Sequence, residues 1–323
     1  MIIDIAAHYI PITIQKMFAE NLHFAKAATY PFPPSNADPE VRLGLMEKHG
    51  VDMQALLAHT WITPPVRKAF TPKEQEQLRK ISNRENYALC KAYPGKFVNI
   101  CAISLLDVNA ALEELKRCTQ ELDCRAVTIA TNQVGQGIDS PEFLPFYQAL
   151  AEHDLPLYLH PTDWESRYPL VDMTTGWRMM HVFGWPFDTT QAVWRLIYGG
   201  VLDRCPTLKV ITHHLGAMLP YFQRRVEVNA SMYLGTTLPR PISEYWENLY
   251  GDTAVDGTRA ALPCGYAFFG PDRMLFGTDY PYGPEEGEDF VRENLTAVMA
   301  MNLPDKEKAQ ILAGNACRLL KIG

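Results

Sequence analysis

The sequence predicts an α/β protein whose parallel strands close into a (β/α)8 TIM barrel. Three observations support this fold. Short apolar runs rich in β-branched residues alternate with capped helical patterns, as in proteins built on a parallel sheet. Eight strand–helix units fit into 323 residues, at about 40 residues each. The strands are apolar almost throughout, which is typical of a sheet covered on both faces. We therefore expect residues 1–323 to form one barrel domain with C-terminal helices.

The strands are predicted from apolar runs that lie between turn signals. An open doubly wound sheet is the alternative arrangement of the same elements. No G-x-G-x-x-G motif follows the first strand, so the sequence does not support dinucleotide binding. The expected strands span, in order, residues 2–8, 53–59, 97–104, 125–130, 157–160, 208–213, 248–253 and 273–278.

Each strand is followed by a helical pattern, and several of these helices begin with a capping residue. Side-chain oxygens of Asp and Thr accept hydrogen bonds from the N–H groups of a first helical turn. A long segment, Pro161–Phe187, separates the fifth strand from its helix, and the last helices cover residues 285–321. The expected N-caps are Asp38, Thr71 (in a capping box with Glu74), Asp107 and Asp188.

Composition excludes several classes of protein. The net charge is −7 and the sequence has no Lys/Arg stripe, so nucleic acid is not an expected partner. There is no apolar run of 18 residues, and we expect no membrane span. The N-terminal segment lacks the basic start of a secretory signal. The seven cysteines are scattered without a C-x-x-C pair, which indicates reduced thiols in a cytoplasmic protein.

Histidines gather at the predicted strand ends, which is where active sites lie in barrels of this class. Five of the nine histidines occupy such positions, and the eighth strand runs into Asp279. Imidazole and carboxylate are common ligands of zinc and related divalent ions. The five histidines are His8, His59, His160, His213 and His214.

A catalytic metal needs about three protein ligands and one open position. His8, His160 and Asp279 are candidates for the three ligands, and His214 would then act as a general acid or base. His213 is adjacent to His214, so the strand pleat should point the two side chains to opposite sides, with only one facing the interior. A structural role is the alternative for each residue, because a strand-end histidine can serve as a hydrogen-bonding group and an aspartate as a helix cap.

Several spaced motifs resemble the amidohydrolase superfamily over nearly the whole chain. The branch is that of aminocarboxymuconate-semialdehyde decarboxylase and the γ-resorcylate-type decarboxylases. The resemblance implies that His160 and Asp279 bind metal, that His8 is the second histidine of a strand-one pair, and that His214 is catalytic. It also implies a homodimer or higher homo-oligomer. The motifs are Ile2-Ile3-Asp4-Ile5, Leu157-Tyr158-Leu159-His160-Pro161, Leu202 to Lys209, His214-Leu215-Gly216 to Tyr221, Phe276-Gly277-Thr278-Asp279-Tyr280-Pro281 and Gly314-Asn315-Ala316 to Leu320.

One position departs from the pattern that the resemblance implies. The family has His or Glu two residues before the strand-one histidine, and this chain has Ala6 there. A methyl group cannot bind metal, so three ligands remain. Three readings stay open: one catalytic divalent metal, with zinc expected and manganese or magnesium as alternatives; a weaker exchangeable metal; or a metal-free site that uses Asp279, His160 and His214. Residues 125–130 contain no lysine, so a two-metal site is not expected.

Aromatic and cationic residues follow the second and fifth strands, at the same rim of the barrel. Aromatic walls suit a planar conjugated ligand, and arginine suits a carboxylate through its two parallel donors. Packing between subunits is the alternative role for these residues, and His59 is either a pocket wall or structural. The expected substrate-binding residues are His59, Trp61, Trp164, Arg167, Trp177 and Arg178.

The leading functional hypothesis is a lyase: non-oxidative decarboxylation of an aromatic or muconate-like carboxylic acid. Burial raises a carboxyl pKa, so we expect Asp279 to be protonated and to deliver its proton to the ring carbon. A metal-dependent hydrolase or hydratase of a lactone, amide or ring is the second hypothesis. A barrel that binds an aromatic acid without turnover is the third.

Overall fold

The computed structural model describes residues 1–21, 32–162, 179–233 and 238–322. Within these ranges an eight-stranded sheet has the order β1-β2-β3-β4-β7-β8-β9-β10, and every neighbouring pair is parallel. All eight predicted strands are therefore confirmed. The strands are β1 (Ile3–His8), β2 (Met53–Leu57), β3 (Phe97–Ala102), β4 (Ala126–Ala130), β7 (Leu157–His160), β8 (Val210–Thr212), β9 (Leu249–Asp252) and β10 (Met274–Leu275).

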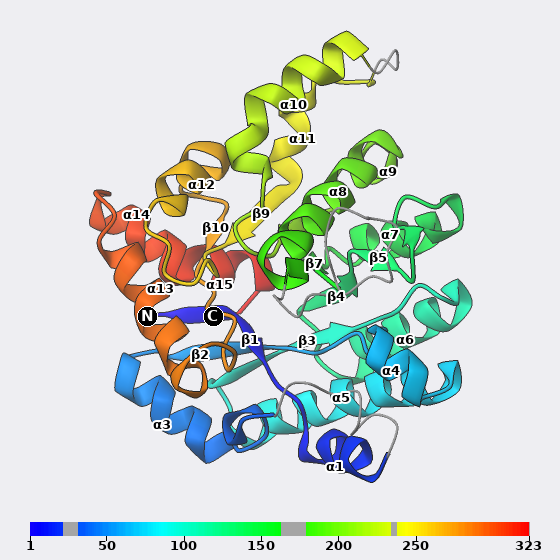
Figure 1. Cartoon of the computed structure of the whole chain (residues 1–323), viewed down its shortest axis with the longest axis vertical. Helices are drawn as coiled ribbons and strands as arrows, with labels where there is room; N and C mark the ends of the chain where they lie inside the picture. The colour runs from blue at the N-terminus through cyan, green and yellow to red at the C-terminus, as the bar shows by residue number, and fades with distance from the viewer. Residues whose placement is uncertain (22–31, 163–178, 234–237, 323) are drawn as a thin grey trace.

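The sheet closes between its first and last strands. The backbone N–H of Ile5 donates to the carbonyl of Phe276 at 2.9 Å, and that of Asp279 donates to the carbonyl of Ala6 at 2.9 Å. Figure 1 shows the strands at the centre of the molecule with helices around them. The predicted (β/α)8 barrel is confirmed. The sequence did not indicate the small hairpin of β5 (Asn132–Gln133) and β6 (Gln136–Gly137) that follows β4.

The helices follow the predicted order, and three expected N-caps are confirmed. The side chains of Asp38, Thr71 and Asp107 accept first-turn N–H groups, and Thr71 completes its capping box. The helices are α1 (Ile12–Glu20), α3 (Pro39–His49), α4 (Pro64–Ala69), α5 (Pro72–Ala92), α6 (Val108–Glu121), α7 (Leu144–Glu152), α8 (Trp185–Tyr198), α9 (Val201–Arg204), α10 (Leu219–Tyr233), α11 (Ile242–Tyr245), α12 (Ala261–Phe269), α13 (Glu288–Met299), α14 (Asp305–Ala309) and α15 (Asn315–Leu320).

The prediction that Asp188 is the fourth N-cap is wrong. Helix α8 begins at Trp185 after a π-helical turn, so Asp188 lies inside its first turn. The buried carboxylate of Asp188 instead accepts hydrogen bonds from Thr131 and Asn132 in the segment that follows β4. These hydrogen bonds link helix α8 to the segment that follows β4. Asp188 and its partners are far apart in the sequence, so a capping rule based on neighbouring residues does not predict the link.

Asp4 connects β1 to the turn that carries Asp279. Its carboxylate accepts the hydroxyl of Thr278 at 2.6 Å, and it also accepts the backbone N–H groups of Thr278 and Ala6, each at 3.1 Å. Burial raises the pKa of Asp4 to about 6, although these hydrogen bonds oppose the shift. These contacts hold Thr278 against β1. They therefore fix the backbone position from which the Asp279 side chain extends into the site.

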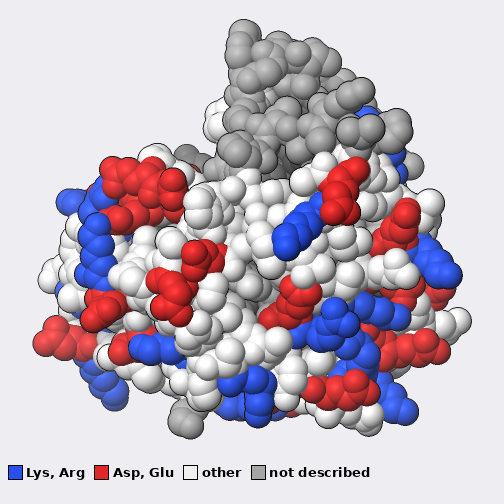
Figure 2. Space-filling view, turned by 90° about the horizontal axis from the view of Figure 1, so that it is seen from below, with Lys and Arg blue, Asp and Glu red and all other residues white. Residues whose placement is uncertain are grey.

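The surface mixes charges of both signs. Figure 2 shows Lys and Arg interspersed with Asp and Glu over the face in view. Among the described residues, none of the helices has the length and apolar character needed to cross a membrane. All seven cysteines are free, and four of them are buried.

Candidate active site at the barrel mouth

Polar side chains from distant parts of the sequence meet at the C-terminal ends of the strands. His8 and His160 end β1 and β7, and Asp279 follows β10. His8 Nε2 lies 3.0 Å from Asp279 Oδ1 and 3.3 Å from His160 Nε2. The rings of His213 and His214 lie beside this group, and the His213 ring stacks on that of His160 with centroids 5.2 Å apart. The expected convergence of His8, His160, His214 and Asp279 is thus observed.

The expectation that only one of His213 and His214 faces the interior is wrong. Strand β8 ends at Thr212, and the backbone is left-handed from His214 (φ 54°) to Ala217 (φ 56°). Strand alternation does not continue through such a turn. The two rings stack with centroids 3.8 Å apart, and both belong to a group of metal-binding type with Asp279. His213 is therefore a member of the site that the sequence reasoning assigned to the opposite side.

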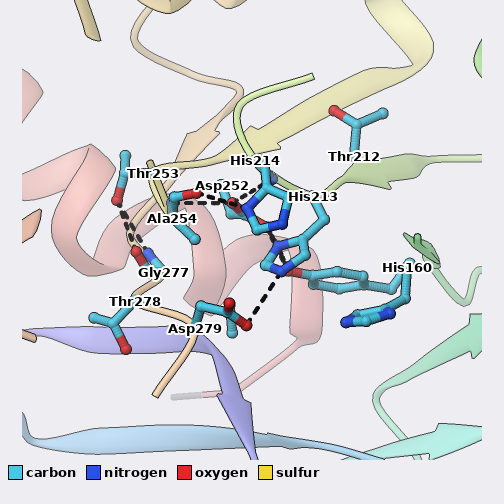
Figure 3. A network of polar contacts seen from close by, with 12 residues as sticks. His160, Thr212, His213, His214, Asp252, Thr253, Ala254, Gly277, Thr278 and Asp279 are labelled. Atoms are coloured by element: carbon cyan, nitrogen blue, oxygen red, sulfur yellow. Dashed lines mark hydrogen bonds and ion pairs between the residues drawn. The ribbon is translucent and has the colours of Figure 1, made fainter. Parts of the chain in front are cut away.

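Asp252 and Tyr158 hold His213 in place, and Figure 3 shows Asp252 beside His213 and His214. Asp252 Oδ2 accepts a hydrogen bond from His213 Nδ1 at 2.7 Å, and the Tyr158 hydroxyl donates to the same carboxylate. Asp252 Oδ1 accepts the backbone N–H groups of His214 and Ala254, each at 3.1 Å. Asp252 is fully buried at the end of β9. Asp252 lies at the end of the seventh strand. This position is the sequence signal for its role, as the end of the eighth strand is for Asp279.

The prediction that burial keeps Asp279 protonated is wrong. Burial by itself would raise its pKa, but hydrogen bonds and positive charge from His213 and His8 hold that pKa well below its usual range. The contacts are short: His8 Nε2 is 3.0 Å and His213 Nε2 is 3.4 Å from Asp279 Oδ1. Asp279 is therefore a carboxylate in the free protein, ready to accept a proton or to bind a cation.

The histidines of the site differ in their protonation. Burial opposes a charge on His213, yet the carboxylates of Asp252 and Asp279 raise its pKa to about 10. Burial, together with the charge on His213, lowers the pKa of His214 to about 4. Burial, with the neighbouring imidazoles, also lowers the pKa of His160 well below its usual range. His214 and His160 are thus neutral at pH 7, and each has one nitrogen available to accept.

The lowered pKa of His214 predicts a loss of stability in acid. The unfolded imidazole takes up a proton near pH 6.5, whereas the folded one stays neutral to about pH 4. Acidification in this window therefore favours the unfolded chain. Between pH 7 and pH 5 we expect this residue to cost roughly 2 kcal/mol of unfolding free energy. Urea unfolding of wild type and His214→Asn at both pH values should show a smaller loss in the variant. Equal losses would contradict the assignment.

Aromatic residues form one wall of the mouth. The His59 ring stacks on that of His8 with centroids 4.7 Å apart, and its Nε2 lies 3.0 Å from the Tyr282 hydroxyl. Trp61 lies against His59, but its indole N–H donates to Ser82 and its ring packs on Phe18 in the apolar core. Tyr282 was not among the sequence-predicted residues. Four others that were, Trp164, Arg167, Trp177 and Arg178, lie outside the described residues.

The donor atoms fit a divalent metal. His160 Nδ1 lies 2.7 Å from the carbonyl of Pro161, so this nitrogen carries the proton and Nε2 presents a lone pair to His8. In the part of the chain that the structure describes, two groups of side chains have ligand atoms within 4.8 Å of one another: His8, His160 and His213, and His213, His214 and Asp279. Imidazole nitrogen with carboxylate oxygen is a donor set that suits zinc and related ions.

Comparison with known proteins places the chain among the amidohydrolases. A family model described as amidohydrolase matches residues 3–322. Gamma-resorcylate decarboxylase of Rhizobium sp. (strain MTP-10005) is 28% identical over 296 residues, which cover 88% of this chain and 87% of that protein. The 2-amino-3-carboxymuconate-6-semialdehyde decarboxylase of Dictyostelium discoideum is 26% identical over 289 residues, covering 88% and 76%.

A solved structure shares the fold over nearly its whole length. It is a dihydroxybenzoic acid decarboxylase from Polaromonas sp. JS666 with bound manganese and the inhibitor 2-nitroresorcinol. The TM-score is 0.77 at 22% identity, with 99% of this chain and 97% of that chain covered. The family model and the two relatives confirm the resemblance drawn from the motifs. Since the family model spans residues 3–322, the chain belongs to the amidohydrolase family, and its relatives named here are decarboxylases.

Proposed function

We propose that the protein is a non-oxidative decarboxylase of an aromatic or muconate-like carboxylic acid. The observation that carries the proposal is the meeting of His8, His160, His214 and Asp279 at the barrel mouth, beside an aromatic wall. The named relatives act on acids of this kind, and this chain covers most of their length. The substrate would lie against His59 and Tyr282, with its carboxylate held by Arg167 or Arg178 and its ring bounded by Trp164 and Trp177.

The proposed cofactor is one divalent metal held by His8, His160 and Asp279. Zinc suits the imidazole-rich donor set, and manganese, which the Polaromonas structure contains, is the alternative. When bound, such an ion would supply positive charge to the oxygens of the substrate while electrons accumulate on the ring. His8 already lies close to both of the other ligands, with its Nε2 3.0 Å from Asp279 Oδ1 and 3.3 Å from His160 Nε2.

Asp279 is proposed to carry the proton of the reaction. Its Oδ1 faces His8 and His213, which leaves Oδ2 for the substrate. Because the carboxylate starts ionised, it first takes a proton from an acidic hydroxyl of the substrate and then delivers it to the carbon that bears the carboxylate. The carbon–carbon bond breaks, its electron pair returns to the ring, and CO2 leaves. A proton from solvent restores the hydroxyl.

His214 is proposed to orient the substrate hydroxyl. Its Nδ1 lies 2.8 Å from the carbonyl of Ala254, so Nδ1 donates and Nε2 accepts. With a pKa of about 4, the ring is neutral at pH 7 and can receive a hydrogen bond at Nε2. The same carbonyl contact fixes the plane of the ring, so the acceptor direction is set before the substrate arrives.

The test is release of CO2 from a panel of hydroxybenzoates that includes 2,6-dihydroxybenzoate. In heavy water the product should carry one deuterium at the carbon that lost its carboxylate. Metal content should be measured on protein purified without added metal.

Hydrolysis or hydration of a lactone, amide or ring is the second candidate function. The ionised state of Asp279 favours it, because a carboxylate can act as a base. Ring-opened or hydrated products without CO2 would select it, and binding of the acids without turnover would indicate a noncatalytic barrel.

The protein is further proposed to be a cytoplasmic homodimer. All seven cysteines are free, in keeping with a reducing compartment. Helix α10 extends away from the barrel (Figure 1), and it exposes 80% of Tyr221 and 62% of Met232. Exposed aromatic and methionine side chains are typical of interfaces. Light scattering after size exclusion should give twice the mass of 36.6 kDa, and a mass equal to one chain would contradict the dimer.

A further inference from the structure

The candidate metal site lacks a donor at position 6, and the structure shows what surrounds that position. Ala6 is fully buried on β1 and contributes only a methyl group. A Cβ placed on Gly277 would lie 3.0 Å from the Cβ of Ala6 and 3.0 Å from that of Asp252. Ala6, Gly277 and Asp252 are thus closely packed, and Asp252 is the carboxylate that supports His213.

His213 presents its imidazole to the candidate metal ligands. Its side chain is buried, and its ring approaches those of His160 and His8 with centroids 5.2 and 6.3 Å away. Its ligand atom lies within 4.8 Å of those of His8 and His160, and it shares a second such group with His214 and Asp279. His213 is the residue common to both groups, so it lies centrally among the donor atoms.

The hydrogen bonds of His213 leave one nitrogen for a metal. Nδ1 is engaged by Asp252 Oδ2 at 2.7 Å. Nε2 is buried and forms an ion pair with Asp279 Oδ1 at 3.4 Å, so it would become a metal ligand when a cation replaces the proton between these two atoms. A carboxylate that holds the far nitrogen of an imidazole is the usual support of a metal-binding histidine, because it fixes both the tautomer and the ring plane.

Three separations among the donor atoms agree with a shared ion. Ligand atoms about 2.0–2.1 Å from a tetrahedral zinc lie about 3.3 Å from one another. The separations here are 3.0 Å for His8 Nε2 to Asp279 Oδ1, 3.3 Å for His8 Nε2 to His160 Nε2, and 3.4 Å for His213 Nε2 to Asp279 Oδ1.

We propose that His213, held by Asp252, is a metal ligand that replaces the donor missing at Ala6. This rests on the metal site of the proposed function and extends it to four protein ligands: His8, His160, His213 and Asp279. The site then needs no side chain from position 6. His214 stays outside the ligand set, since its Nδ1 is bound to the Ala254 carbonyl and its role is toward the substrate.

The first test counts imidazole ligands in the wild-type protein. X-ray absorption at the zinc edge of the zinc-loaded protein should fit three imidazoles. Two imidazoles would overturn the proposal, as would failure of the wild type to bind one metal per chain. This measurement needs no variant, so it does not depend on whether a buried substitution folds.

The second test compares matched variants by titration with Zn²⁺ and Mn²⁺. Asparagine at position 213 places an amide N–H near the position of Nδ1, so it can still donate to Asp252, but it has no atom in place of Nε2. We expect His213→Asn to weaken metal binding more than about 100-fold, and Asp252→Asn to weaken it about 10- to 100-fold. The control His214→Asn removes the neighbouring imidazole and should keep wild-type affinity.

Circular dichroism and thermal unfolding of each variant report whether the barrel has formed. Folded His213→Asn that binds metal as tightly as the wild type would overturn the proposal. Decarboxylation is assayed separately on the wild type. Three imidazoles without CO2 release would refute the proposed reaction and leave this ligand set standing. CO2 release with only two imidazoles on the metal would support the proposed reaction and refute the four-residue ligand set.

Discussion

Replacing Asp279 with asparagine should lower turnover by about 1,000-fold or more while the barrel still folds. General acid–base catalysis by a placed side chain contributes about 10²- to 10⁴-fold, and here the same residue also binds the proposed metal. Asparagine keeps the size of the side chain and can still contact His8, but its amide cannot accept a proton and return it to carbon. Initial rates of CO2 release measure the effect.

The matched control is Asp154→Asn, the same chemical change on an exposed side chain. Asp154 is 50% exposed and pairs with Lys209 and Lys321 at the surface, away from the strand ends that carry the site. This variant should keep the wild-type rate. If Asp279→Asn retained most of the wild-type activity, Asp279 would not carry the proton, and the proposed mechanism would fail.

Removal of divalent metal should also lower the rate by about 100-fold or more, and added Zn²⁺ or Mn²⁺ should restore it. A bound cation supplies several kcal/mol of charge stabilisation to reactions of this kind. The fold should survive, because the buried apolar residues of the barrel and its helices pack without contribution from the site. Rates are measured after dialysis against a chelator, with elemental analysis of the same sample.

The control for this experiment is chelator already saturated with Ca²⁺, which should leave the rate unchanged. Protein that elemental analysis shows to be free of metal, yet that retains full activity, would contradict the metal site. The remaining hypothesis would then be a metal-free site, in which protons are transferred by Asp279, His160 and His214 alone.

The sequence predicted which polar residues lie at strand ends, and it predicted that their side chains come together at the barrel mouth. His8 and His160 close apolar runs, and Asp279 follows the last of them, so a barrel must bring all three to one mouth. The contribution of His213 was not predictable by the same route. A strand pleat assigns neighbouring residues to opposite faces, but the left-handed backbone that begins at His214 brings both rings to one side.

The ionisation of Asp279 also depended on the tertiary structure. Burial alone favours a neutral carboxyl group, and the sequence offers no measure of the opposing effect. That effect comes from His8 and His213, which are remote from Asp279 along the chain and within 3.4 Å of it in space. Charge interactions of this strength act over a few ångströms, so their sign follows from which side chains meet.

The sequence by itself determined the barrel, its eight strands, three of its helix caps and the family to which the chain belongs, because apolar periodicity, capping residues and spaced motifs are local properties. Only the tertiary structure decided that Asp188 ties a helix to the barrel, that Asp252 holds His213, and that Asp279 is ionised. Each of these depends on contacts between segments far apart in the chain. Their distances are set by how the strands close and the loops turn, which no local pattern encodes.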